Sequence, residues 1–401
     1  MAVSAAERPV AVETASRRRF AWSAGAVALS ALVFTRLPVL AAGLAAVSIV
    51  GTQPAPVAEA LWRVAPQEWA NLLARWDTFY YHSIAVTGYA WHPDVFRHDN
   101  VVFFPLYPLL MRWGGALLGG HPIAAGLFVS LIAFTGAIAL LYQLAVLEIG
   151  PDLARRAVLL LVTFPYALFF STVYTESLFL LLSVGAFYAM RRGHLGLTAL
   201  CGLAVGLTRP NGFWMWLPLA ILAWTGNPPA RGESTVSSRR ILALAAACTP
   251  LVGVSLYSLY LHVRFDDAIA WVHGQRAWGL PLVGQASAPD PPPLPWQPHM
   301  PWQEIVTWIG NIIAFAMGAL AIRPVSRRFG IAYAIWIAVN IFPPVAAHLF
   351  LSLGRFTSVL FPVFFWLAVS IPRRHVIPVA AAFAAAQIVL AFWFFLWIPV
   401  V

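Results

Sequence analysis

Long apolar runs, separated by short polar segments, are the dominant pattern of this chain. Many of the runs reach the ~20 residues that a helix needs to cross the hydrocarbon core of a membrane. Their residues do not alternate between apolar and polar in ~10-residue strands, as those of a transmembrane β-barrel do. The pattern therefore predicts an all-α polytopic membrane protein.

The composition supports this prediction and gives the protein an orientation. Hydrophobic residues make up 61% of the 401 residues and charged residues only 10%, whereas charged residues approach a quarter of a soluble globular chain. All 25 basic residues are arginine, and most stand in short clusters between apolar runs. Positive charge gathers in this way in cytoplasmic loops, so the net charge of +10 does not point to nucleic acid.

The arginine clusters allow the membrane crossings to be counted. Arg17–Arg19 precedes an apolar run that is too long for a signal peptide, so we expect a cytoplasmic tail over residues 1–21. About eleven spans, within a range of ten to twelve, then keep every later arginine cluster inside. The expected spans are residues 22–50, 122–147, 157–174, 177–190, 195–209, 212–225, 241–262, 304–322, 329–350, 355–371 and 376–399.

Two segments do not fit a regular count. A crossing at residues 103–120 would put the next arginine cluster outside, so we expect a re-entrant or surface-lying helix there. The stretch LTRPNGF, Leu207–Phe213, contains Pro-Asn-Gly, a strong turn signal, which predicts a break between two short helices. Broken helices at membrane depth are tolerated where they line a cavity.

The predicted topology is one membrane-embedded domain over residues 1–401, with two large outer segments. The first outer loop covers residues 51–121, and a second outer loop, proline-rich in part, covers residues 263–303. Its proline-rich stretch is either a stiff irregular loop or a lid. The isolated polar residues gather on this outer face, which is therefore the expected working side of the protein.

The stretch RWDTFYYHSIAVTGY places an aspartate, Asp77, in an otherwise apolar region. A carboxylate at the edge of the hydrocarbon is costly unless it is paired or functional. Asp77 is therefore either an ion-pair partner of Arg75 or another outer arginine, or a working carboxylate. Helical spacing puts Tyr80 and Tyr81 on its face and Arg75 with His82 on a neighbouring stripe. The aromatic side chains by themselves are better explained by an interfacial belt.

Further polar residues on the outer face suggest an anionic substrate. Glu176 is either a helix-start residue favoured by the helix dipole or a site residue. Arg209, Arg276 and Arg355 are each explained by snorkelling, but together they suit phosphate, which arginine binds in a forked, bidentate way. The sequence contains no P-loop, dinucleotide fingerprint or GxSxG motif. A lipid-phosphate donor therefore fits better than a soluble nucleotide.

The cysteine and carboxylate patterns give little support for a metal or cofactor. Cys201 and Cys248 each lie inside an apolar run and are expected to be small buried side chains. No CxxC or His/Cys ligand spacing is present. We expect no required cofactor, although Asp266 and Asp267 together with Asp77 leave a divalent cation as an alternative.

Several motifs, in one order along the chain, resemble the family of the second GPI mannosyltransferase, glycosyltransferase family 76. The resemblance extends from about residue 70 to about residue 370. Its motifs are RWDTFYYHSIAVTGY, VVFFPLYPLLMRW, VYTESLFLLL, LTRPNGF, DDAIAWVHGQRAWG and LGRFTSVLFPVFFWLA. One position departs from the family pattern, because either Asp266 or Asp267 fills the slot of its YGD-like segment.

The resemblance implies a GT-C fold and a polyprenyl-phosphate-linked sugar donor, with mannose as the expected sugar. In the GT-C superfamily an acidic residue of the first outer loop is catalytic, and Asp77 matches it. The other motif residues would bind donor or acceptor. They are Arg75, Trp76, Tyr80, Tyr81, His82, Glu176, Arg209, Asn211, Asp267, His273, Gln275, Arg276 and Arg355.

The expected reaction is an inverting transfer with Asp77 as general base, because one carboxylate suffices for a single displacement. The arginine-only basic composition suggests a GC-rich genome and hence a bacterial plasma membrane, with transfer on the extracytoplasmic face. The acceptor would then be a glycolipid or a cell-envelope glycan, and membrane lipids would surround the protein. Two alternatives stay open: a lipid-linked pentose transferase of the arabinose type, and a lipid or sugar transporter.

Overall fold

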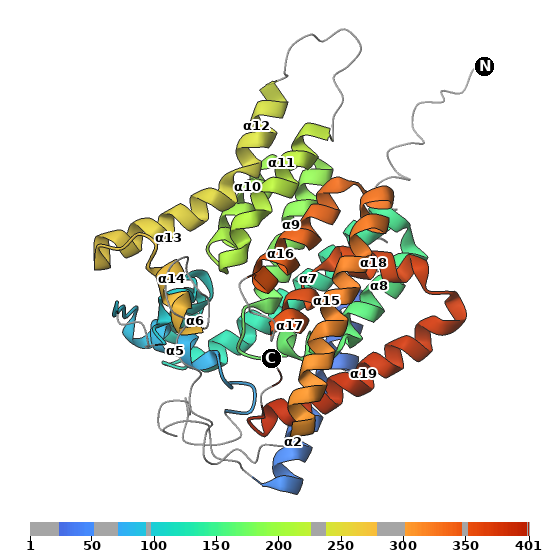
Figure 1. The fold of residues 1–401 in the computed structure, drawn as a ribbon, viewed down its shortest axis with the longest axis horizontal. Helices are drawn as coiled ribbons and strands as arrows, with labels where there is room; N and C mark the ends of the chain where they lie inside the picture. Colours follow the sequence, from blue (N-terminus) through green and yellow to red (C-terminus); the bar gives the residue numbers. More distant parts are fainter. Residues whose placement is uncertain are drawn as a thin grey trace, which may run out of the picture.

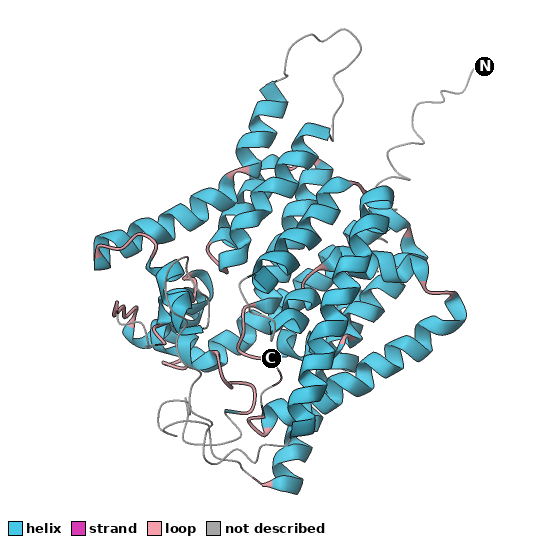
Figure 2. Ribbon diagram, in the orientation of Figure 1, coloured by secondary structure: helices cyan, strands magenta, loops and turns pink. Residues whose placement is uncertain are grey.

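The computed structural model describes residues 24–51, 71–93, 98–225, 238–278, 301–346, 352–398 and 400. These residues form helices joined by short connections, and the described part of the chain contains no strand (Figure 2). The prediction of an all-α protein is therefore confirmed. The predicted cytoplasmic tail over residues 1–21 and the proline-rich residues 279–300 lie outside the described residues.

The described part of the chain starts with one long apolar helix, and a group of short helices follows from residue 71. The first span, Ala24–Val50, includes a π-helical turn η1 (Leu32–Arg36) and α2 (Leu37–Val50). The segment predicted to be the first outer loop contains α5 (Thr78–Thr87), η2 (Asn100–Val102) and α6 (Leu106–Leu117). The other elements are α7 (Pro122–Ile149), α8 (Pro151–Thr163), η3 (Pro165–Ser171), α9 (Glu176–Arg192), α10 (Leu195–Gly206), η4 (Pro210–Met215), α11 (Trp216–Thr225), α12 (Ser238–Ala247), α13 (Thr249–Phe265), α14 (Ala270–His273), η5 (Gly274–Trp278), α15 (Pro301–Phe329), α16 (Ile331–Ala346), α17 (Leu353–Ser358), α18 (Phe361–Ser370) and α19 (Arg373–Phe395).

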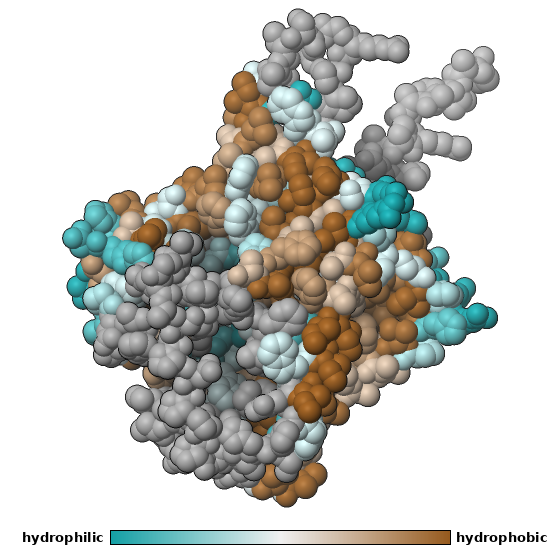
Figure 3. Space-filling model, in the orientation of Figure 1, coloured by the Kyte–Doolittle hydropathy of each residue, from teal (hydrophilic) through white to brown (hydrophobic). Residues whose placement is uncertain are grey.

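Several helices have the length and apolar character of membrane spans. Four helices in the described part are both long enough and apolar enough to cross a membrane. The number rises to six if each of two bent helix pairs, α8 with η3 and α12 with α13, is counted as one span. The shorter apolar helices α10, α16 and α18 add to this set. Broad apolar surface covers the helices in Figure 3, as expected for lipid-facing sides. The count of eleven spans stays a prediction.

Both irregular segments consist of short elements, and the re-entrant or surface-lying position of the first stays a prediction. α6 has 12 residues, about 18 Å of helix, which is too short to cross the bilayer, and it packs against α5 and α7 (Figure 1). In LTRPNGF, α10 ends at Gly206, Arg209 has an extended backbone and η4 begins at Pro210. The predicted break in this helix is therefore confirmed.

The two cysteines differ in exposure. Cys201 on α10 is buried, as expected for a small apolar side chain, whereas Cys248 is exposed. The prediction for Cys248 is wrong because this residue lies in the 41° bend between α12 and α13 rather than within a packed helix.

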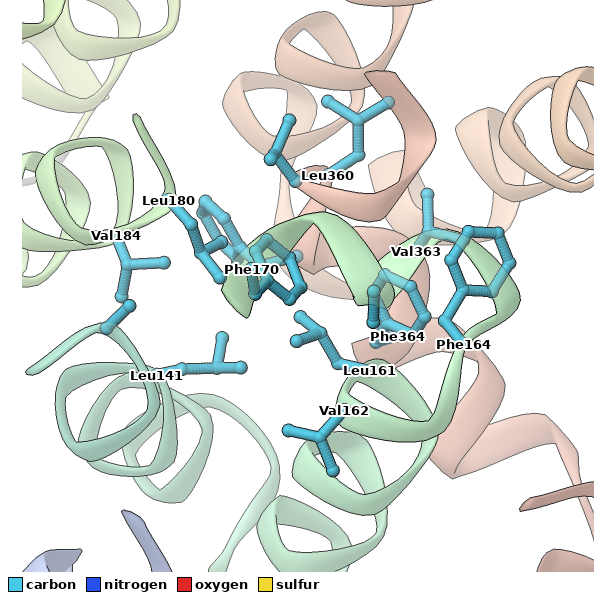
Figure 4. Packing of buried hydrophobic residues seen from close by; sticks show 14 of the residues in the cluster. Leu141, Leu161, Val162, Phe164, Phe170, Leu180, Val184, Leu360, Val363 and Phe364 are labelled. Atoms are coloured by element: carbon cyan, nitrogen blue, oxygen red, sulfur yellow. The ribbon is translucent and has the colours of Figure 1, made fainter. Parts of the chain in front are cut away.

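The apolar core gathers around η3, the short helix that follows the 82° bend after α8. Figure 4 shows Phe170 of η3 among side chains from its neighbours, including Leu141 of α7, Leu180 of α9 and Leu360 ahead of α18. All four side chains are fully buried. The core therefore fixes η3, which leads directly into the turn STVYTES.

The bend between α8 and η3 interrupts the helical hydrogen bonds and leaves carbonyl groups to be satisfied. Arg36 donates from Nη2 to Val162 O at 2.8 Å and also donates to Ala167 O. Gln387 of α19 donates from Nε2 to Phe164 O at 2.8 Å. These two side chains therefore tie the first and last long helices to the bend.

Candidate active site

Four charged side chains from distant parts of the chain meet in a charged cluster: Asp77, Glu176, Arg209 and Arg355. Arg355 donates from Nη1 to Asp77 Oδ2 at 2.9 Å. It also donates from Nε and Nη2 to Glu176 Oε1, at 2.9 and 2.8 Å. Arg209 donates from Nη1 to the same Glu176 oxygen at 3.0 Å. Asp77 is therefore paired, and its partner is Arg355 rather than Arg75. Its role as a working carboxylate stays a prediction.

The members of the charged cluster differ in burial. The Glu176 side chain is fully buried, and those of Arg209 and Arg355 are 9% and 7% exposed. Buried charges are costly unless they are paired, and the cluster meets this condition with two carboxylates and two guanidinium groups. The Asp77 side chain is 22% exposed. It is therefore the carboxylate of the cluster that an incoming hydroxyl can reach.

Aromatic rings hold the guanidinium groups in place. The guanidinium carbon of Arg355 lies 4.9 Å from the ring centroid of Phe169 and 4.8 Å from that of Tyr174. That of Arg209 lies 5.6 Å from the ring centroid of Phe179. Such contacts stabilise a cation where water is scarce. Phe169 belongs to η3, so the core below the bend also supports the cluster.

The turn STVYTES fixes both carboxylates of the cluster. Glu176 is the first residue of α9. Two residues earlier, the Tyr174 hydroxyl accepts a hydrogen bond from the backbone N–H of Asp77 at 3.3 Å. The Thr78 hydroxyl donates to Val173 O at 3.0 Å. The start of α5 is therefore held against the turn that carries Glu176.

Arg75 and Trp76 face a different part of the molecule from Asp77. Arg75 is fully buried, donates from Nη2 to Phe395 O at 3.0 Å, and lies 4.3 Å from the Trp397 ring. Trp76 has a left-handed backbone, with φ of 50°. The expected helical stripe of Arg75 and His82 is therefore wrong, because the turn at Trp76 separates Arg75 from α5. These contacts tie the first outer loop to the end of α19.

The predicted aromatic residues of α5 pack beside the cluster. The Tyr80 ring stacks on Phe103, with centroids 4.6 Å apart. The Tyr81 hydroxyl lies 3.3 Å from Thr175 Oγ1. His82 is half-buried, and this burial lowers its pKa below the usual value for histidine, which favours the neutral ring at neutral pH.

Asn211 connects the broken helix to α16. Its Nδ2 donates to Asn340 Oδ1 at 2.7 Å, and Asn340 in turn donates to Trp336 O at 2.8 Å. Asn211 is two residues beyond Arg209, so this pair of amides also positions the segment that carries Arg209.

The motif DDAIAWVHGQRAWG forms a second group on α14 and η5. Asp267 accepts from the backbone N–H of Ile269 at 3.1 Å and pairs with His273 Nδ1 at 2.7 Å. Asp266 is 97% exposed and ends α13 with a left-handed backbone. Of the two aspartates, Asp267 is thus the one built into the local structure. Gln275 is half-buried in η5, and the side chain of Arg276 lies outside the described residues.

Metal-binding geometry is not found in the part of the chain that the structure describes. No group of three or more His, Cys, Asp or Glu side chains stands close enough together there to hold an ion. The positions of Asp77, Asp266 and Asp267 therefore give no support for a cation bound between them. Independence from metals and cofactors stays a prediction.

Sequence reasoning missed several residues that support the site. Asn311 Oδ1 accepts the backbone N–H of Gly354 at 2.8 Å. A Cβ on Gly354 would lie 2.2 Å from the Tyr166 ring, so only glycine allows this approach. Arg36 supports the bend before η3. Asn311 and Arg36 were detectable in the sequence as lone polar residues within apolar runs. Such residues destabilise a membrane-embedded helix unless they are paired or functional.

A comparison with known protein families bears on the region that carries most of the charged cluster. Residues 52–223, less than half of the chain, match the family described as Mannosyltransferase (PIG-V). The matched region includes Asp77, Glu176 and Arg209. The match confirms the resemblance of the motifs over these residues, and together with the apolar helices it supports a membrane glycosyltransferase. No curated protein matches the sequence.

Among solved structures, the chain is similar to the crystal structure of the Archaeoglobus fulgidus oligosaccharyltransferase in complex with Zn and sulfate. The similarity has a TM-score of 0.43 at 12% sequence identity and covers 90% of this chain. It covers 53% of the oligosaccharyltransferase chain, so this protein spans about half the length of that structure.

Proposed function

We propose that the protein is a GT-C mannosyltransferase that uses a polyprenyl-phosphate-mannose donor. The acceptor is a glycolipid or a cell-envelope glycan, and transfer takes place on the extracytoplasmic face of a bacterial plasma membrane. The observation that carries the proposal is the charged cluster: a partly exposed Asp77 held by Arg355, with two of its neighbours in the region that matches a mannosyltransferase family.

In the proposed reaction, Asp77 takes the proton of the acceptor hydroxyl. The hydroxyl oxygen forms a bond to the anomeric carbon of mannose, while the bond from that carbon to the phosphate oxygen breaks. The bonding electron pair leaves with the phosphate, which becomes a lipid phosphate monoester. A β-linked donor therefore yields an α-linked product.

The cluster supports a single displacement rather than a double one. A retaining mechanism needs a second carboxylate free to attack the sugar. Glu176 is fully buried and accepts three hydrogen bonds from Arg209 and Arg355 through Oε1, so it is poorly suited to act as that nucleophile. The leaving phosphate needs charge stabilisation, which a fixed guanidinium group provides without reorganisation.

Transfer in vitro with a panel of donors tests the proposal. The purified full-length protein is supplied with a membrane-lipid extract and with polyprenyl phosphate carrying radiolabelled mannose or arabinose. We expect label from the mannose donor to appear in a new lipid or glycan. Transfer from the arabinose donor alone would show that the transferred sugar is a pentose rather than mannose. No transfer from either donor would contradict the proposal and favour a transporter.

A further inference from the structure

We infer that the two arginines of the charged cluster have different functions. Arg355 is a positioning residue that holds Asp77, whereas Arg209 is the cation that binds the phosphate of the lipid ligand. The inference rests on the proposed function, because it assigns the phosphate of the donor to one side chain of that site.

All three nitrogens of the Arg355 guanidinium group are already engaged. Nη1 donates to Asp77, and Nε and Nη2 donate to Glu176. The backbone around it is also fixed, because Gly354 N–H donates to Asn311 and the Ser358 hydroxyl donates to Arg355 O. A phosphate that bound Arg355 would have to displace a carboxylate, so we assign Arg355 to the orientation of Asp77.

Arg209 is engaged through one nitrogen only. Its Nη1 donates to Glu176, while Nε and Nη2 have no hydrogen-bond partner among the described residues and are not sealed from solvent. One open edge of a guanidinium group presents two parallel N–H donors, which matches two phosphate oxygens. Arg209 therefore has the geometry to accept a phosphate without losing its bond to Glu176.

Glu176 links the two functions. Its Oε1 accepts all three hydrogen bonds, and Oε2 is buried without a partner among the described residues. An isolated carboxylate is far too costly to bury, so Glu176 keeps both guanidinium groups in place. When Arg209 binds a phosphate through Nε and Nη2, its Nη1 keeps the bond to Glu176, and Arg355 keeps two bonds to Glu176 and one to Asp77.

Binding of a short-chain polyprenyl phosphate without sugar tests the inference on the full-length protein in detergent. A hydrogen bond to a charged group contributes ~1.5–3 kcal/mol, which corresponds to about 10- to 100-fold in affinity. We expect Arg209→Gln to weaken binding by this factor, and Arg355→Gln to change it less than about threefold. Arg191→Gln is the matched control, because Arg191 pairs with Glu148 outside the cluster and is 40% exposed. Thermal unfolding and gel filtration verify that each variant is folded.

The kinetic counterpart separates positioning from binding. In the transfer assay, Arg355→Gln should lower kcat with little change in the KM for the donor, whereas Arg209→Gln should raise that KM. Arg209→Lys keeps the charge, retains part of the binding, and serves as the second variant if Arg209→Gln does not fold. Equal loss of lipid-phosphate binding in the Arg209 and Arg355 variants, or loss in the Arg355 variant alone, overturns the inference.

The binding assay also separates this inference from the proposed function. A protein that transfers no sugar but loses polyprenyl-phosphate binding in Arg209→Gln supports the assignment of Arg209 and contradicts the transferase. Phosphatidic acid is the second probe. If phosphatidic acid binds as tightly as polyprenyl phosphate and its binding also depends on Arg209, the contact between Arg209 and a phosphate is supported. The same result would contradict the assignment of that phosphate to an isoprenoid lipid.

Discussion

Asp77 can act as a base only if its carboxylate is held in place and keeps one open side. Arg355 meets the first condition by donating to Oδ2, and the partial exposure of the side chain meets the second. Glu176 has the opposite environment, because it is closed from solvent and shared between two arginines. The two carboxylates of the cluster therefore differ in accessibility rather than in chemical type.

Removal of Glu176 should be costly for the fold. Loss of one partner from a buried ion pair typically destabilises a protein by ~3–5 kcal/mol, so we expect Glu176→Ala to lower the free energy of unfolding by about this amount. Equilibrium unfolding in a denaturing detergent measures the change. Asp152→Ala is the control, because Asp152 is an exposed carboxylate in the first turn of α8, and we expect a loss of at most about 1 kcal/mol. Similar losses in the two variants would show that the cluster gives no special stability.

At the residue scale, the sequence identified all four members of the charged cluster but not their pairing. Charge and position were sufficient to single out Asp77, Glu176, Arg209 and Arg355. The partner of Asp77 lies 278 residues further along the chain, and no local spacing encodes such a contact. The position of Arg75 was predicted wrongly because Trp76 has a left-handed backbone. Residues other than glycine rarely adopt this conformation, and nothing in the sequence marks Trp76 as an exception.

Short elements and breaks, rather than long spans, carry the cluster. α17 holds Arg355, the start of α9 holds Glu176, and the extended residue before η4 holds Arg209. Figure 1 shows α17 in the middle of the bundle, among long helices that fix its surroundings. The long helices therefore hold the short elements in place, and the irregular backbone of these elements brings the charged side chains into contact.

Gly354→Ala should displace α17 and with it Arg355. The added methyl group would meet the Tyr166 ring at 2.2 Å, and overpacking of this kind costs ~1–3 kcal/mol. We expect a lower melting temperature and a loss of transfer of at least about tenfold, which a shift near 1 Å can produce. Gly196→Ala is the control, since its Cβ would meet no atom within 4 Å. Unchanged transfer in Gly354→Ala would show that Arg355 is not held through α17.

At the element scale, local signals predicted one break and missed another. Pro-Asn-Gly correctly indicated the break after α10. The bend between α8 and η3 was expected to lie within one span, over residues 157–174, because the run is apolar throughout. The bend is stable only because Arg36 and Gln387, from distant helices, satisfy its carbonyl groups. The sequence can single out Arg36 as a lone charge in an apolar run, but it does not show which distant carbonyl groups that side chain satisfies.

In the whole molecule, α5, α6 and α14 lie together on one side of the bundle (Figure 1). α14 packs on η2, and the Tyr257 hydroxyl of α13 donates to Val101 O at 2.7 Å. These contacts join the two outer segments that the sequence predicted. The proposed extracytoplasmic site requires this side to face away from the cytoplasm.

Cysteine labelling in intact cells tests this orientation. In a background with Cys201 and Cys248 replaced by serine, Thr87→Cys should react with a membrane-impermeant thiol reagent, because Thr87 is exposed at the end of α5. Arg192→Cys, at the exposed end of α9, should react only after the membrane is permeabilised. The reverse pattern would place the charged cluster on the cytoplasmic side.

At the scale of the whole molecule, the sequence predicted the class better than the number of crossings. Apolar runs identify a helical membrane protein directly. Their division into spans depended on charge counting, and short helices such as α10, α11 and α18 have 10 to 12 residues. Helices of this length do not cross a bilayer alone, so hydropathy cannot say which of them combine into one crossing.

The rate of mannose transfer by Asp77→Asn is the measurement that tests the account most directly. The substitution keeps the size of the side chain and removes its ability to accept a proton. We expect a folded variant to lose ~10²–10⁴-fold in rate, while Asp152→Asn, at an exposed carboxylate that begins α8, transfers like the unaltered protein. A folded Asp77→Asn variant that transfers mannose at the unaltered rate would contradict the assignment of Asp77 as the base.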